Sequence, residues 1–138
     1  MRPNIKTVTA IGIFMLIAVA TNSKQTKRNY VLKVEAYFYS QVIFAAAGLT
    51  CEGFEQKIDL HHTIIKDKKQ INVIINELES ASVGEVNPKF IDTRGKLFIF
   101  YDSGVIDTVC LNYTKYVYYR NSLVRLKSSK LIDLVYSL

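Results

Sequence analysis

The C-terminal third of the chain consists of short runs of alternating apolar and polar residues separated by tight turns, and this pattern constrains the fold most. The runs are 96–101, 105–111, 116–119 and 123–126. Period-two alternation of aromatic and β-branched residues is typical of half-buried strands. Gly104, in the first turn, supplies the positive φ that tight hairpins require. Strands joined this closely pair antiparallel, so the pattern predicts an antiparallel sheet.

Two more strands are expected earlier in the chain. The segment 30–39 alternates: one side carries Val31, Lys33, Glu35 and Tyr37, and the other carries Leu32, Val34, Ala36 and Phe38. The apolar run within 62–66 is shorter and reads as a second strand. The predicted sheet therefore has about five to six strands.

Two amphipathic helices are expected beside these strands. Asp67 is followed three positions later by Gln70, which is the spacing of a capping box. This spacing predicts a helix over 68–80. Ser128 or Ser129 caps a second helix near the end of the chain. Its apolar stripe is formed by Leu131, Leu134, Val135 and Leu138. With 82–88 read as a loop, the sequence predicts an α+β domain whose helices pack on one face of the antiparallel sheet.

The N-terminus has the three parts of a secretory signal. Arg2 and Lys6 precede an apolar run over 8–19, and Ala18-Val19-Ala20 is a small-x-small exit. A membrane-spanning helix needs roughly 20 apolar residues, so this run predicts a removable leader and no stable membrane span after cleavage. We therefore expect a signal peptide over 1–20, a flexible basic lead-in over 21–29 and a single domain over 30–138. The product would be periplasmic, on the cell surface or secreted.

The charge balance bears on the kind of partner. The chain has 18 Lys and Arg against 12 Asp and Glu, and loss of the leader removes two of the basic residues. A modest positive excess on an exported domain argues against nucleic-acid recognition.

Cysteine usage leaves one structural question open. Cys51 and Cys110 are too few for a disulfide framework, but export permits one bridge between them. Such a bridge requires Cα atoms within about 7 Å of each other. The alternative is two buried thiols that pack as small apolar groups.

Catalytic chemistry has little support in the sequence. His61 and His62 are the candidate metal ligands, but neighbours on a strand point to opposite faces, and neither a cysteine pair nor helical spacing accompanies them. A nucleophilic Cys51 served by one histidine and oriented by Asp59 is the strongest enzymatic arrangement. No cofactor motif occurs. Asp92 and Arg94 are expected to form a buried pair that fixes a loop.

Tyrosine is concentrated near the C-terminus. The candidate binding face comprises Tyr113, Lys115, Tyr116, Tyr118 and Arg120. Tyrosine and arginine combine apolar area with hydrogen bonding and are enriched at protein interfaces. The same row would also arise from cross-strand aromatic pairing without any ligand.

The run from Asp92 to Gly104, followed by a hairpin ending in Cys110, resembles small exported Bacteroidetes domains of unassigned function. The resemblance covers the last half of the chain. It implies an envelope or surface location and brings no catalytic residue.

These observations predict a non-enzymatic exported domain that binds another macromolecule, protein rather than carbohydrate. An inhibitor or immunity-type role is one form of this function. Two alternatives stay open: a small hydrolase or metal-dependent enzyme built on Cys51, His61 and His62, and a structural component of the cell envelope.

Overall fold

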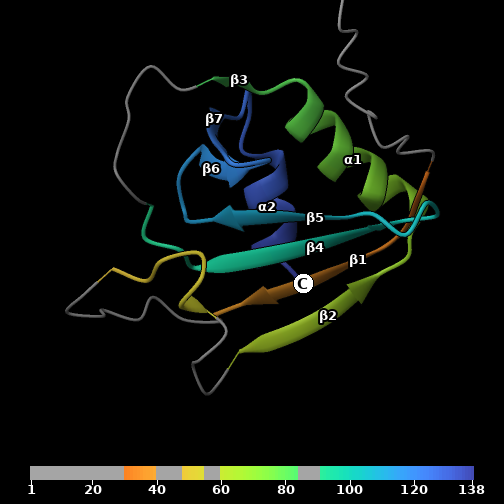
Figure 1. The fold of residues 1–138 in the computed structure, drawn as a ribbon, viewed down its shortest axis with the longest axis horizontal. Helices are drawn as coiled ribbons and strands as arrows, with labels where there is room; N and C mark the ends of the chain where they lie inside the picture. Colours follow the sequence, from red (N-terminus) through yellow and green to blue (C-terminus); the bar gives the residue numbers. More distant parts are fainter. Residues whose placement is uncertain (1–29, 40–47, 55–59, 84–90) are drawn as a thin grey trace, which may run out of the picture.

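The computed structural model describes residues 30–39, 48–54, 60–83 and 91–138 (Figure 1). The predicted signal peptide and the basic lead-in lie outside these residues, as does Asp59. The described residues form an α+β domain with one sheet and two helices, so the predicted fold class is confirmed.

The sheet is antiparallel throughout and has seven strands in the order β2-β1-β4-β5-β6-β7-β3. The strands span Val31–Phe38 (β1), His61–Ile65 (β2), Ser82–Val83 (β3), Gly95–Tyr101 (β4), Ile106–Leu111 (β5), Tyr116–Tyr119 (β6) and Ser122–Arg125 (β7).

The expectation of five to six strands was wrong by one. Ser82–Val83, expected to lie in a loop, pairs with Arg125 and Val124 of β7 as the two-residue strand β3. A strand this short has no readable alternation, and only the neighbouring strand supplies its pairing.

The hairpin turns follow from local backbone preferences. Gly104 has φ 80°, as predicted for the turn between β4 and β5. Arg120 and Asn121 have φ 48° and 58° and form the two-residue turn between β6 and β7. Two successive positive φ values define the type I′ turn, whose twist matches that of paired strands.

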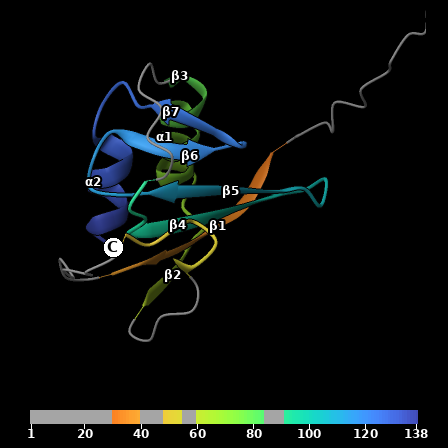
Figure 2. The same cartoon turned by 60° about the vertical axis from the view of Figure 1, so that its left-hand side comes forward.

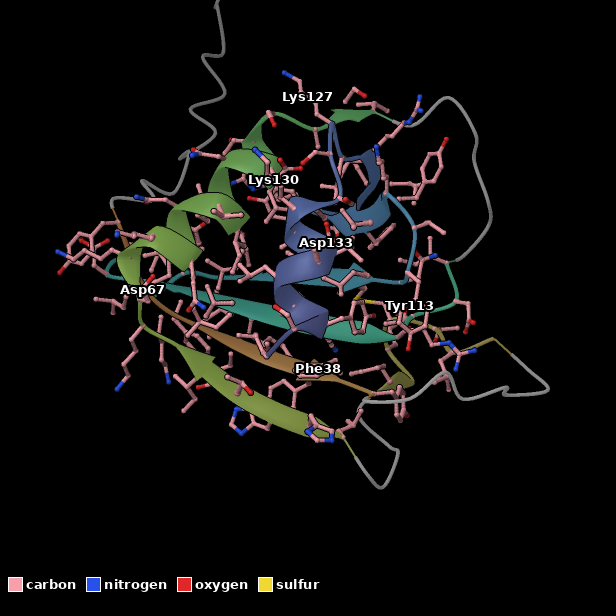
Figure 3. All side chains as sticks on the ribbon, turned by 180° about the vertical axis from the view of Figure 1, so that it is seen from behind. Phe38, Asp67, Tyr113, Lys127, Lys130 and Asp133 are labelled. Carbon is pink, nitrogen blue, oxygen red and sulfur yellow. A yellow bond between two sulfur atoms is a disulfide. The ribbon has the colours of Figure 1, made fainter. Side chains whose placement is uncertain are left out.

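Both helices, α1 (Lys68–Glu79) and α2 (Lys130–Tyr136), pack on one face of the sheet. In Figure 1 the strands lie in front of α2, and in Figure 3, seen from behind, α2 lies in front of the strands. The Asp67 carboxylate accepts a hydrogen bond from the backbone N–H of Gln70 at 2.9 Å, so the predicted cap begins α1. The core lies between this face and the helices.

The second helix differs in detail from the expected stripe. Leu131 and Val135 are buried as predicted, but Ile132 is buried as well, and Leu138 lies beyond the helix and is exposed. The helix ends at Tyr136, so the last residue of the expected stripe lies outside it. The Ser128 hydroxyl accepts from the backbone N–H of Lys130 and donates to Glu77 of α1 at 2.6 Å, which ties the two helices together.

Candidate functional site

One face of the sheet carries no helix, and we call it the open face. The register of the strands places alternate residues there, opposite the buried rows that face the helices. In Figure 2, α2 lies to one side of β4 and β5 and leaves the other side of these strands without a helix. The open face comprises Lys33, Glu35, Tyr37, His62, Ile64, Lys96, Phe98, Phe100, Ile106, Thr108, Tyr116 and Tyr118.

Aromatic rings make up the centre of the open face. The rings of Tyr37 and His62 stack with centroids 4.3 Å apart, and Phe98 meets Tyr37 edge-on at 5.8 Å. Two lysine ammonium groups make cation–π contacts with these rings. Lys33 Nζ is 4.4 Å from the ring centroid of Phe100, and Lys96 Nζ is 5.1 Å from that of Phe98. Such contacts hold cations against apolar area. Lys96 is buried and Lys33 is partly exposed beside Glu35, so the surface is mainly aromatic.

Glu35 is the acidic group within this surface. It accepts hydrogen bonds from Lys33 Nζ at 2.6 Å and from the Tyr37 hydroxyl at 3.2 Å. The hydrogen bond from Lys33 lowers the pKa of Glu35 below its ordinary value, although burial opposes the shift. Glu35 therefore remains ionised and fixes the Lys33 side chain on the sheet.

The segment 48–54 is attached to the open face at one end. Cys51 is joined by a disulfide to Cys110 of β5, with Cα atoms 5.6 Å apart. Phe54 is fully buried and packs edge-on against Tyr39 at 5.4 Å. The bridge and this aromatic contact anchor the segment over the sheet.

The expected pair of Asp92 and Arg94 forms and supports the same segment, but only Arg94 is buried, and the Asp92 side chain is 41% exposed. Arg94 Nε donates to Asp92 Oδ2 at 2.9 Å, and Asp92 Oδ1 accepts from the backbone N–H of Leu49. The Leu49 carbonyl accepts in turn from the backbone N–H of Thr93. The pair has a structural role, because both residues are engaged in holding the loop.

A hollow of about 520 Å³ lies between this segment and the strands. It is lined by Cys51, Glu52, Lys96, Ile106, Asp107, Thr108, Tyr118, Arg120 and Asn121. Ile106 is 51% exposed and Tyr118 is 40% exposed, so the hollow opens beside two of the most accessible apolar side chains of the open face.

A polar cluster that the sequence analysis missed lies on the helix side of the sheet. Asp107 Oδ2 accepts from the hydroxyls of Tyr101 at 3.2 Å and Tyr119 at 3.3 Å, and from Arg120 Nε at 3.2 Å. Arg120 also donates to Glu79 of α1 at 3.0 Å. The cluster thus joins three strands to the first helix. The available signal was an acidic residue at an inward position of a strand, since Asp107 alternates with Val109 and Leu111.

Burial in this cluster raises the pKa of Tyr119 and of Tyr101 above the ordinary tyrosine value, and the charge of Asp107 adds to the effect on Tyr101. Both hydroxyls therefore remain protonated and act as donors. The Asp107 carboxylate is therefore a buried charge whose hydrogen bonds are satisfied by neighbouring side chains.

The five residues of the predicted binding face do not share a surface. Tyr116 and Tyr118 belong to the open face, but the ring of Tyr113 contacts Tyr136 of α2 at 4.6 Å on the helix side. Arg120 is held by Asp107 and Glu79. Lys115 lines a separate hollow of about 200 Å³ with Arg125 and Lys127. The prediction grouped these five residues because they are close in sequence, but the turns before and after β6 place them on different surfaces.

The histidine pair divides between the two faces of β2. His62 stacks on Tyr37 of the open face, and His61 stacks on Phe38, whose side chain faces the core. Within the described parts of the chain, no three His, Cys, Asp or Glu side chains come close enough together to hold a metal ion. Cys51 has no thiolate while it is bridged to Cys110, so a nucleophilic role would require reduction first.

The geometry defines the class of the molecule: an α+β domain with a seven-stranded antiparallel sheet, helices on one face and an aromatic open face. Comparisons of the chain with protein-family models, with curated proteins and with solved structures found no match. None of the helices among the described residues is long and apolar enough to cross a membrane.

Proposed function

We propose that this chain is an exported, non-catalytic binding domain and that it binds a protein partner through the open face. The observation that carries the proposal is the arrangement of aromatic rings and ring-bound lysines on the face that neither helix covers. An inhibitor or immunity-type role is a specific form of this function. It is supported by the small size of the domain and by the export leader that the sequence predicts at residues 1–20.

Rigid aromatic area supports a binding role. Tyr37, Phe98 and Phe100 are each partly buried by neighbours on the sheet, so a partner would immobilise few additional side-chain rotamers. Interfaces draw most of their free energy from a small number of such anchors. Ile106 and Tyr118 stand beside them and extend the apolar area to the edge of the hollow.

The polar groups of the open face favour a protein over a polyanion. Lys33 is paired with Glu35 at 2.6 Å, and the hollow carries Glu52 as well as Lys96. Opposite charges interleaved with rings suit a mixed protein surface, whereas polyanions require an excess of positive charge.

Site-specific photo-crosslinking tests which face binds. A benzophenone amino acid would replace Ile106 on the open face or, as the control, the exposed Asn76 on the outer side of α1. In cells that make the protein with its own leader, we expect a discrete adduct with one protein from position 106 and none from position 76. Adducts of equal yield from both positions, or none from position 106, would overturn the proposal.

A matched tyrosine pair sharpens this test. Tyr118 on the open face is 40% exposed, and Tyr113 on the helix side is 43% exposed. Tyr118→Ala should reduce the yield of the position-106 adduct at least about tenfold, as expected for loss of an anchor of about 1.4 kcal/mol or more. Tyr113→Ala should leave the yield unchanged. Equal effects of the two substitutions would contradict a role for this face.

A further inference from the structure

The strand β2 forms one end of the sheet and leaves one side of its backbone without a partner strand among the described residues. The opposite end is β3, which has only two residues, and short edge strands resist pairing. β2 is longer, with five residues in regular register against β1 from His61 to Ile65. It is therefore the edge on which another strand could be added.

The five residues of β2 itself include none of the types that usually protect an edge strand. The strand reads His61-His62-Thr63-Ile64-Ile65 and contains no proline, lysine, arginine, aspartate or glutamate. Natural edge strands are commonly guarded by such residues or by a β-bulge, and the pairing of β2 with β1 has no register shift. Ile64 is 48% exposed on the open-face side of the edge. An unguarded edge with an exposed β-branched side chain is suited to strand addition.

We infer that β2 pairs antiparallel with β2 of a second copy of this chain, centred on Thr63. In this register Thr63 lies opposite Thr63, and each Ile64 lies opposite His62 of the partner subunit. The same edge then serves both subunits, as two-fold symmetry requires. Thr–Thr pairs and pairs of a ring with a β-branched residue are favourable across strands, and no like charges meet.

The dimer would have a defined shape. Residues directly opposite each other in an antiparallel pair project from the same side of the sheet, so the two-fold axis is perpendicular to the sheet. The two open faces would then form one continuous surface, with both pairs of helices on the other side. Five residue pairs bury less area than a stable interface of at least about 1,000 Å² requires, so the association should be concentration-dependent.

Cysteine cross-linking tests the register on the purified mature protein. Thr63→Cys places two thiols at the symmetry axis, within the Cα spacing that a disulfide accepts. The control is Val83→Cys on β3, which at 78% exposure is more accessible to random collision. We expect Thr63→Cys to form a covalent dimer under mild oxidation at least about tenfold faster than the control, because pairing raises the effective concentration of the thiols. Equal rates, or a faster control, would overturn the inference.

Sedimentation velocity over a concentration series tests the edge by a second route. Ile64→Lys introduces a guarding charge on β2, whereas Ile106→Lys introduces the same charge at a side chain of similar exposure away from this edge. The wild type and Ile106→Lys should dimerise with the same constant, and Ile64→Lys should remain monomeric at concentrations where they do. A wild type that stays monomeric at every concentration would refute the dimer.

The two proposals fail separately. Ile106→Lys should weaken partner binding by the open face and leave self-association intact, whereas Thr63→Lys, on the helix side of β2, should do the reverse.

Discussion

At the scale of single residues, Asp107 stands out as the buried carboxylate among the described residues. It is buried, and one carboxylate oxygen accepts from two tyrosine hydroxyls and a guanidinium. A buried charge is tolerated only when its partners satisfy it, and removing one partner leaves the others unpaired. The stability of the domain should therefore be sensitive to this position.

Replacement of this carboxylate is the first stability prediction. Asp107→Ala should lower the free energy of unfolding by about 2–4 kcal/mol, because Tyr101, Tyr119 and Arg120 lose their common acceptor. Urea denaturation followed by circular dichroism measures the loss. Glu52→Ala, at an exposed carboxylate, is the control and should change stability by less than about 0.5 kcal/mol. A similar small change at Asp107 would contradict the argument.

The tyrosines predict how stability depends on alkaline pH. Burial raises the pKa of Tyr119, Tyr101 and Tyr136 in the folded protein. Above about pH 10 the unfolded chain loses these phenolic protons while the folded protein retains them, so stability falls as the pH rises. Each such tyrosine contributes a slope of up to about 1.4 kcal/mol per pH unit.

Urea denaturation at pH 9, 10 and 11 measures this slope. Tyr119→Phe should make it shallower, and Tyr118→Phe, at an exposed site, should not. A wild-type stability that is constant over this range would contradict the conclusion that these hydroxyls are buried and protonated.

At the scale of secondary structure, sequence patterns predicted the strands and helices well where local chemistry is decisive. The alternation of β1 and β4, the cap at Asp67 and the turn at Gly104 all depend on residues close together in the chain. Strand β3 was missed because its pairing with β7 is tertiary. For the same reason, the sequence could not separate Tyr113 from Tyr118, since the side each occupies depends on a turn and on where α2 packs.

The disulfide gives a prediction about how elements are joined. It links the segment 48–54 to β5 across 59 positions of the chain. The loop-entropy relation for a closure of this length gives about 4 kcal/mol of stabilisation. The double variant Cys51→Ser, Cys110→Ser should lose about 2–4 kcal/mol of unfolding free energy in urea. Adding a reductant should destabilise the wild type and leave the double variant unchanged; a reductant effect on both would contradict a role for this bridge.

At the scale of the whole molecule, the helices divide the sheet into a covered and an open side, and the segment 48–54 lies over one end of the open side. The sequence predicted the covered side, because buried rows are apolar and periodic. The composition of the open face could not be assembled from sequence, since Tyr37, Phe98 and Tyr118 share one face only through the strand order β1-β4-β5-β6. The candidate site therefore depends on the order of the strands in the sheet, which the sequence does not reveal.

The strand order also governs when the domain can form. The strand β1 lies inside the sheet between β2 and β4. Its pairing with β4, which begins with Val31 opposite Tyr101, can form only after Tyr101 has been synthesised. A chain that ends before Gly95 would retain only the pairing of β1 with β2, and two strands alone are not stable in water. Pairing over such long separations slows folding. The sheet should thus form only when β4 and the strands that follow it are available, which requires most of the chain.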